Sequence, residues 1–388
     1  MPGIYSLKGT VKHYDWGGFD FIPHLLNEEN ASHIPFAEYW LGTHPLGMGM
    51  VQSGDEEPQP LSQVVPSLSF LLKAQDVRKM LSIQVHPSKE SAEIEFDREN
   101  AAGIPLNAPH RNYKDDNHKP EMLVAQSDFW LLHGFKPPEE LIYTLLNVVE
   151  LRPLLEKYNS GGYEGLYRYV MEMPQEEVNR LLDPLVQNLG VIYEIEQPDK
   201  TDEDYWAAKA AAEFTRDGNI DRGIFSIYLL NIVHLKKGEG LFQSAGLPHA
   251  YLEGQCVEVM ANSDNVLRGG LTIKHIDITE LMKHVRFEAT YPAILSGEPT
   301  ADVDLYYPAP VTDFRLSAFD LEAGQEAAFH VDNPQVLLLT EGNAVVMQDG
   351  RSVELKPGSP AALLLPGRPI SLVARSKSII FRASGANA

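Results

Sequence analysis

The chain of 388 residues contains a single cysteine, Cys256. One cysteine cannot form a disulfide within the chain, and one thiolate is too few for a thiolate zinc site, so both kinds of cross-link are excluded. We therefore expect a reducing compartment. We interpret Cys256 itself as a small residue of the hydrophobic core.

Long apolar runs are also missing from the sequence. No stretch approaches the roughly 18 to 20 apolar residues that a membrane-spanning helix needs. The opening stretch Met-Pro-Gly-Ile-Tyr-Ser-Leu-Lys lacks the basic and then apolar pattern of a secretory signal. These absences predict a cytoplasmic protein that does not associate with membranes.

Positive charge is scarce. The chain has 32 Lys and Arg residues against 54 Asp and Glu residues, which gives a formal net charge of -22 at pH 7. Because nucleic acids and anionic membranes bind basic surfaces, we expect neither as a partner. An anionic substrate would need cationic side chains gathered locally at its site.

Hydrophobic residues make up 44% of the chain, which is enough for two or three globular domains. Short apolar or alternating stretches predict β-strands over residues 1–137 and again over 219–295, where the run from Ile224 to Leu235 is strongly β-forming. Between these parts, apolar residues recur at helical spacing over 138–218. The last part, 296–388, has apolar runs separated by Gly and Pro turns.

This pattern predicts a mainly β fold with two jelly-roll β-sandwich domains. The first domain is discontinuous and comprises 1–137 plus 219–295. An α-helical insertion domain comprises 138–218, and the second sandwich comprises 296–388. Because His330 is the only histidine of the second sandwich, we expect no metal ligands there.

Gln84 and His86 are two residues apart in the apolar run from Leu81 to Pro87. Side chains two apart on a β-strand point to the same face, so an amide oxygen and an imidazole would converge at the end of a short strand. This is the arrangement of half a metal site.

Two further stretches combine metal-ligand residue types with turn or strand signals. One runs from Tyr113 to Val124 and places Glu121 at the start of an apolar strand. The other runs from Gly246 to Thr272 and contains His249, followed by Arg268 beside two glycines. Two imidazoles, a carboxylate and an amide oxygen would suit Zn²⁺ or a similar divalent ion, with a further position open to substrate.

Each of these stretches also has an ordinary structural interpretation. His118 and Lys119 could form a solvated turn. Arg268 could be an ion-pair partner of Asp264, and the glycines beside it could simply form a turn. Periodicity does not decide between these alternatives and a site.

Taken together, the three stretches resemble the type I mannose-6-phosphate isomerases, also called phosphomannose isomerases. The motifs Gln-x-His-Pro-x-Lys from Gln84, Tyr-x-Asp-x-Asn-His-Lys-Pro-Glu-Met from Tyr113, and His-Ala-Tyr to Ser-Asp-Asn-Val-x-Arg-x-Gly-Leu-Thr-x-Lys from His249 occur in the family's order. The resemblance covers residues 1–290 and includes the opening stretch from Gly9 to Pro45.

The resemblance implies a cupin-type enzyme that interconverts mannose 6-phosphate and fructose 6-phosphate with one zinc ion per chain. It implies a zinc site made by four ligands, which are Gln84, His86, Glu121 and His249. It also implies that Arg268 is catalytic.

Further residues are candidates for the same cavity. Lys119 lies in a motif position that lines the family's cavity. The candidates for substrate binding are Ser88, Lys89, Lys274, Tyr251 and Asp264, and among them Ser88 and Lys89 would join Arg268 in binding phosphate, since hydroxyl, ammonium and guanidinium groups match phosphate oxygens.

The expected reaction moves a carbonyl from C1 to C2 of the sugar, through an enediol that forms when a proton leaves C2. The metal would act as a Lewis acid, and Arg268 would stabilise negative charge. A base must carry the proton, and its pKa should lie near the working pH. His118 is the first candidate by intrinsic pKa, with Lys119 and Glu258 as alternatives.

Two rival functions are a sugar-sensing or structural bicupin without turnover and an oxygenase that uses redox-active iron. The first would lack at least one metal ligand, yet all four candidate positions are filled. Against the second, Gln84 and the lysines and arginine of the motifs favour a phosphosugar. We therefore expect a phosphosugar isomerase, and we expect it to be a monomer.

Overall fold

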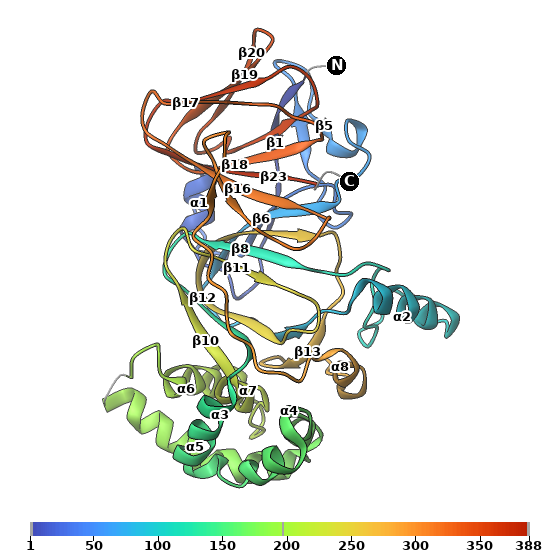
Figure 1. Cartoon of the computed structure of the whole chain (residues 1–388), viewed down its shortest axis with the longest axis vertical. Helices are drawn as coiled ribbons and strands as arrows, with labels where there is room; N and C mark the ends of the chain where they lie inside the picture. Colours follow the sequence, from blue (N-terminus) through green and yellow to red (C-terminus); the bar gives the residue numbers. More distant parts are fainter. Residues whose placement is uncertain (1–2, 196–197, 386–388) are drawn as a thin grey trace.

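The computed structural model of the chain describes residues 3–195 and 198–385. Within these residues the fold is mainly β, as predicted, and most of the helices gather at one end of the molecule (Figure 1). The predicted first domain begins with residues 1–2 and the predicted last domain ends with residues 386–388, and these residues lie outside the described part.

A ten-stranded sheet forms the middle of the molecule. Its strands are β2 (Thr10–Lys12), β3 (Glu38–Leu41), β6 (Phe70–Val77), β7 (Ile83–Val85), β8 (Glu121–Ala125), β9 (Phe129–Phe135), β10 (Leu230–Leu235), β11 (Gly240–Gln243), β12 (His249–Ala261) and β13 (Leu267–Gly270). The 13-residue strand β12 pairs with β7 and β9 in its first half and with β6 and β8 in its second. β12 therefore holds this sheet together.

A nine-stranded sheet combines strands from both ends of the chain. In spatial order it contains β14 (Glu298–Pro299), β15 (Leu305–Tyr307), β16 (Arg315–Leu321), β23 (Ser378–Ser384), β18 (Gln335–Glu341), β21 (Ala361–Leu364), β1 (Ile4–Lys8), β4 (Met50–Gln52) and β5 (Gln59–Pro60). Sheet pairing thus crosses the expected domain boundary between residues 295 and 296, because β1 pairs with β21. The domain division itself remains a prediction.

The nine-stranded sheet packs against the ten-stranded sheet on one face and against a four-stranded sheet on the opposite face. The four-stranded sheet contains β17 (Glu326–Phe329), β22 (Ile370–Ala374), β19 (Ala344–Gln348) and β20 (Arg351–Leu355). Along β18, Leu337 and Leu339 point into the core shared with the four-stranded sheet, whereas Val336 and Leu338 point into the core shared with the ten-stranded sheet. This strand is apolar at successive positions because both of its faces are buried.

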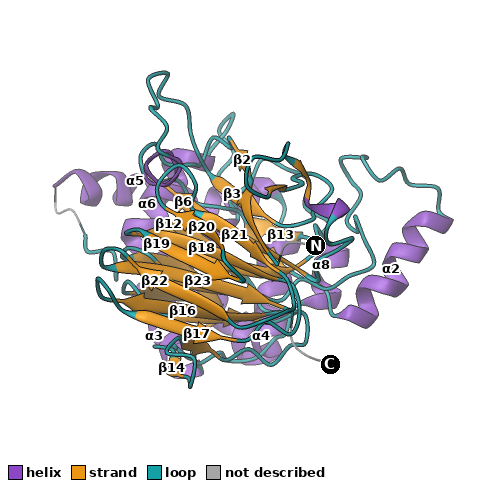
Figure 2. Ribbon diagram, turned by 90° about the horizontal axis from the view of Figure 1, so that it is seen from above, coloured by secondary structure: helices purple, strands orange, loops and turns teal. Residues whose placement is uncertain are grey.

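Helices α3 to α6 occupy the range that shows helical spacing in the sequence. They are α3 (Pro138–Asn147), α4 (Leu154–Glu172), α5 (Gln175–Ile195) and α6 (Glu203–Phe214), with the short 3-10 helix η2 (Val149–Leu151) after α3. The other helices are α1 (Phe21–Leu26), η1 (Leu61–Gln63), α2 (Lys89–Ala101), α7 (Gly223–Leu229) and α8 (Ile278–His284). Seen from above, α2 projects away from the sheets (Figure 2). Among the described residues, no helix combines the length and apolar character needed to cross a membrane.

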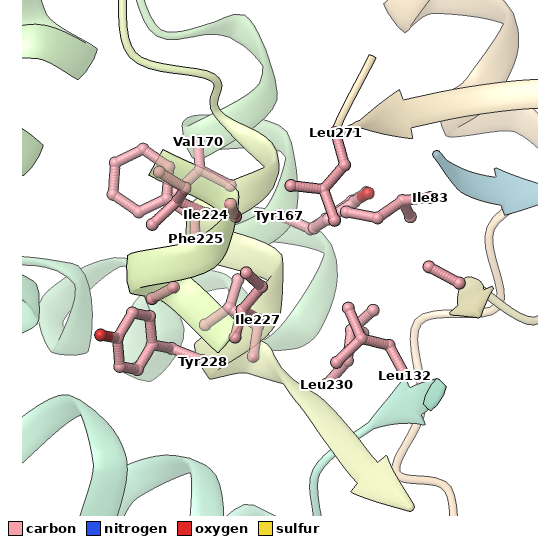
Figure 3. Packing of buried hydrophobic residues seen from close by; sticks show 14 of the residues in the cluster. Ile83, Leu132, Tyr167, Val170, Ile224, Phe225, Ile227, Tyr228, Leu230 and Leu271 are labelled. Atoms are coloured by element: carbon pink, nitrogen blue, oxygen red, sulfur yellow. The ribbon is translucent and has the colours of Figure 1, made fainter. Parts of the chain in front are cut away.

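The prediction of a strand from Ile224 to Leu235 is wrong for the first half of this range, which forms helix α7 before β10 begins. All seven residues of α7 are buried, and they pack against Tyr167 and Val170 of α4 and against Leu132 of the sheet (Figure 3). An apolar run that is buried on all sides has no periodicity that separates helix from strand, so its β propensity misled the prediction.

Candidate metal centre and substrate cleft

Three of the predicted site residues lie in one row across the ten-stranded sheet. Gln84 of β7 is paired with His249 of β12 on one side and with Arg268 of β13 on the other. Residues directly opposite each other on neighbouring strands project from the same face. The register therefore places an amide, an imidazole and a guanidinium beside one another.

His86, Glu121 and His249 form a buried group whose possible ligand atoms all lie within 4.8 Å of one another. The distance from His86 Nε2 to Glu121 Oε1 is 3.6 Å, and that from His249 Nε2 to Glu121 Oε2 is 3.2 Å. On the far side of each ring, Nδ1 lies near a backbone carbonyl: 2.7 Å from Asn265 O for His86, and 2.9 Å from Leu247 O for His249. If Nδ1 carries the proton in each ring, both Nε2 lone pairs face Glu121.

The electrostatics of this group fit a divalent metal ion. His86 Nε2 is buried without a hydrogen-bond partner among the described residues. Burial lowers the pKa of His86 well below its usual range, and Lys119 adds to the effect, so the ring is a neutral donor. Burial opposes the ionisation of Glu121, but its surroundings, with the positive charge of Lys119 first among them, outweigh this effect and hold the pKa of this carboxyl well below its usual range. Neutral imidazoles and a carboxylate are a donor set that Zn²⁺ accepts.

A cluster of buried charged residues lies next to this metal group. Lys73 Nζ is 3.1 Å from Glu258 Oε1 and 3.7 Å from Glu38 Oε1. Gln75 Nε2 and Tyr251 OH donate to the two oxygens of Glu258 at 3.0 and 2.7 Å. A cavity of about 50 Å³ is lined by this cluster together with members of the metal group.

The buried Lys73 and Glu258 of this cluster shift each other's pKa values. Burial opposes the charge of Lys73, but the carboxylates of Glu38 and Glu258 outweigh it and raise the pKa of Lys73. Burial raises the pKa of Glu258, and Lys73 opposes that rise. Lys73 and Glu38 are absent from the predicted site, although a lysine directly after the apolar residues Phe70, Leu71 and Leu72 is a signal for the first of them.

An irregularity in β12 brings the two groups together. The register between β12 and β9 shifts between Tyr251 and Glu253, which leaves Leu252 as an extra residue on β12. His249 lies before this bulge and Glu258 lies after it, and both line the same small cavity.

A larger cleft of about 550 Å³ opens beside the small cavity, and Gln84 lines both of them. Four cationic side chains, Lys79, Arg216, Arg268 and Lys274, line the cleft against the two carboxylates of Asp15 and Glu213, so its formal charge is positive. Burial lowers the pKa of Arg268 and that of Lys274, whose pKa the nearby Arg268 lowers further. In a chain of net charge -22, this concentration of cations suits an anionic ligand.

Other predicted site residues have different surroundings. Lys119 Nζ is 2.9 Å from Glu121 Oε1, and Lys119 lines the small cavity with Tyr251. Asp264 pairs with His44 at 3.3 Å, and in the described part of the chain it makes no recorded ion pair with Arg268.

Five predicted residues line neither cavity: His86 and Asp264, whose surroundings are given above, and His118, Ser88 and Lys89. His118 Nε2 lies 2.9 Å from an oxygen of Asp313. Ser88 caps α2 by accepting from the amide of Ser91, and Lys89 donates to Asn117 Oδ1 at 3.1 Å. The site roles of His118, Ser88 and Lys89 remain predictions.

Comparisons with known proteins find relatives over nearly the whole chain. A family model described as phosphomannose isomerase type I, catalytic domain, matches residues 4–138. Mannose-6-phosphate isomerase of Escherichia coli (strain K12) is 36% identical over 390 residues, which cover 95% of this chain and 97% of that protein. The chain belongs to the mannose-6-phosphate isomerase family. The resemblance seen in the sequence motifs is therefore confirmed.

Other members of the family extend the agreement to the whole fold. The mannose-6-phosphate isomerase of Salmonella typhimurium is 35% identical over 390 residues, covering 95% of this chain and 96% of that protein. A crystal structure of a mannose 6-phosphate isomerase bound with zinc and yttrium superposes with a TM-score of 0.82 at 31% identity, covering all of both chains. The Salmonella typhimurium enzyme bound to substrate (f6p) and zinc gives the same TM-score, identity and coverage.

Proposed function

We propose that this chain interconverts D-mannose 6-phosphate and D-fructose 6-phosphate with one zinc ion, in the cleft that Gln84 shares with the small cavity. The observation that carries the proposal is the buried group of His86, Glu121 and His249, with the unpartnered Nε2 of His86, beside Gln84, which lines a cleft with cationic side chains. Family membership favours this reaction over a sugar sensor without turnover and over an iron oxygenase.

His86, Glu121 and His249 would hold the zinc ion, with the amide oxygen of Gln84 as the fourth protein ligand. When bound, zinc supplies Lewis acidity towards the oxygens at C1 and C2 of the open-chain sugar. Gln84 is neutral, so the site keeps more positive charge than a second carboxylate would leave.

Glu258 is the residue that we assign to carry the proton between C2 and C1. It lines the small cavity, and burial raises its pKa towards the working range of a base. Tyr251 and Gln75 donate to its oxygens and fix their direction. Lys119 remains an alternative because it lines the same cavity, whereas His118 pairs with Asp313.

Arg268 and its neighbours would hold the anionic parts of the sugar. Arg268 lies next to Gln84 in the sheet, so its guanidinium is placed to stabilise negative charge on the enediolate oxygens. Lys274, Lys79 and Arg216 line the rest of the cleft, and we assign the phosphate group to them.

We also propose that the two β units are cupin-like jelly rolls and that the helices are an insertion. Strands β9 and β10 are antiparallel neighbours, yet helices α3 to α7 lie between them in the sequence. The helical segment could thus be added between two paired strands without disturbing their register. A monomeric state and a cytoplasmic location remain predictions, and light scattering during size-exclusion chromatography tests the first.

The proposed reaction is tested by assaying conversion of mannose 6-phosphate before chelation, after chelation and after zinc is added back, with metal analysis of each sample. We expect activity to be lost with zinc and restored with it. A zinc-loaded protein that converts none of the sugar would refute the proposal.

A further inference from the structure

A second polar cavity lies among the C-terminal strands, and it shares no lining residue with the cleft or the small cavity. Its volume is about 150 Å³. Its walls come from β15, β16, β18 and β23 and from the segment that follows β17.

The strand register explains why polar side chains gather there. Ser317 of β16 is paired with Tyr306 of β15 on one side and with Arg382 of β23 on the other, so these three side chains share one face. Two residues further along β16, Phe319 lies on the same face and belongs to the hydrophobic core of the C-terminal sheets. The polar cavity therefore begins where this core ends.

Arg382 forms a fixed wall of the cavity. Its nitrogens donate to Asp302 Oδ2 at 3.1 Å, to Asp304 Oδ2 at 2.5 Å and to Ser317 Oγ at 3.2 Å. Its guanidinium also lies 4.7 Å from the ring centroid of Phe329. These contacts engage Arg382 within the protein and pair two carboxylates with it, of which one negative charge is balanced.

The buried side-chain amide of Gln335 is the feature that points to a ligand. Its side chain lines the cavity and is only 8% exposed, and its Oε1 has no hydrogen-bond partner within the described residues. Exchanging the amide nitrogen and oxygen would place the nitrogen at the same unpartnered position. Since buried polar groups are normally paired, this amide is available to a molecule in the cavity.

The size and charge of the cavity select the class of that molecule. The cavity of about 150 Å³ is partly open to solvent, so a six-membered ring can enter it with some of its substituents left outside. Three carboxylates of Asp302, Asp304 and Asp332 line the cavity against the two guanidiniums of Arg315 and Arg382, so the formal charge of these five groups is negative.

A net negative charge disfavours a phosphate group. Hydroxyl, amide and carboxylate groups instead match a ring that carries several hydroxyls. We propose that this C-terminal cavity is a binding site for a neutral hexose, separate from the site of isomerisation.

Binding of D-mannose to the zinc-loaded full-length chain, measured by calorimetry and by saturation-transfer NMR, tests the proposal. The titration is run with and without saturating fructose 6-phosphate, which occupies the cleft. We expect mannose still to bind when fructose 6-phosphate is saturating. Complete displacement of mannose by fructose 6-phosphate would mean that the cleft is its site, and would overturn the proposal.

Two variants test whether mannose binds in the C-terminal cavity. Gln335→Met removes the buried amide at similar volume, and Asp332→Ala removes an exposed carboxylate of the cavity. Each should weaken mannose binding about tenfold, as expected for the loss of one hydrogen bond. Asp320→Ala is the matched control, because Asp320 is an exposed carboxylate of β16 outside the cavity, and it should leave binding unchanged.

The same variants should leave kcat and KM for mannose 6-phosphate unchanged. If Gln335→Met fails to fold, Asp332→Ala carries the test, since its side chain is exposed. Unchanged mannose binding in Asp332→Ala would overturn the assignment. Binding of Ca²⁺ or inorganic phosphate that is lost in Asp332→Ala, without any mannose binding, would overturn the hexose as the ligand class.

Discussion

Replacing Glu258 by glutamine tests the assignment of the proton carrier most directly. The substitution keeps the volume of the side chain and removes its ability to take a proton. Glutamine can still accept from Lys73 through its oxygen, and the hydroxyl of Tyr251 can rotate to accept from the new amide. We therefore expect the cluster to keep most of its hydrogen bonds.

The expected effect on kcat is large compared with the effect on stability. Loss of a well-placed base should lower kcat about 10²- to 10⁴-fold, which corresponds to roughly 3–5 kcal/mol in the activation free energy. Lys73 keeps Glu38 as a partner at 3.7 Å. We therefore expect the free energy of unfolding to fall by only about 1–3 kcal/mol, the usual range for a weakened buried polar contact.

Glu38→Gln provides a matched control, because it also removes one negative charge beside Lys73. If Glu258 only balanced the charge of Lys73, both variants would lose similar activity. If Glu258 carries the proton, Glu258→Gln should lose at least ten times more kcat than Glu38→Gln while both retain zinc. Steady-state kinetics, zinc analysis and thermal unfolding provide the readouts, and near wild-type turnover by zinc-loaded Glu258→Gln would refute the assignment.

Four further predictions follow from the site. Gln84→Glu should retain zinc but turn over more slowly, because a second carboxylate reduces the positive charge of the site; a fully active variant would contradict this. Arg216→Ala should raise KM for mannose 6-phosphate about tenfold without changing zinc content, whereas Arg180→Ala, on the exposed surface of α5, should not. If Lys89 binds the phosphate group, Lys89→Ala should raise KM for mannose 6-phosphate at constant zinc content. Burial lowers the pKa of His133 to about 3, whereas in the unfolded state the ring takes a proton below about pH 6.5. The free energy of unfolding should therefore fall between about pH 6.5 and pH 3. Thermal unfolding at pH 5 should show that His133→Gln removes about 2 kcal/mol of this acid-induced loss of stability.

Short sequence spacings predicted the local parts of the structure well. The strand carrying Gln84, the helix-rich segment and the burial of Cys256 all agree with the structure. The ligand types could also be identified because His86, Glu121 and His249 each stand in a recognisable family motif. The structure then brings these three side chains together.

Spacing could not predict which strands become neighbours. Lys73 and Glu38 reach the site through the pairing of β6 with β3 and β12, which no local pattern encodes. The pairing of β1 with β21 joins residues at opposite ends of the chain for the same reason. His118 was chosen for its intrinsic pKa, but its direction depends on Asp313, which lies far away in the sequence.

The bulge in β12 determines on which side of the sheet Glu258 lies. His249 and Glu258 are nine positions apart in the sequence, and on a regular strand an odd difference in position places two side chains on opposite faces. The extra residue Leu252 corrects this parity, so a hydroxyl two residues after His249 can reach the carboxylate of Glu258 at 2.7 Å. Deleting Leu252 would leave every proposed ligand and the proposed base in the sequence, yet it would turn Glu258 to the face opposite His249. The chemistry proposed for this chain thus depends on a residue that takes no part in it.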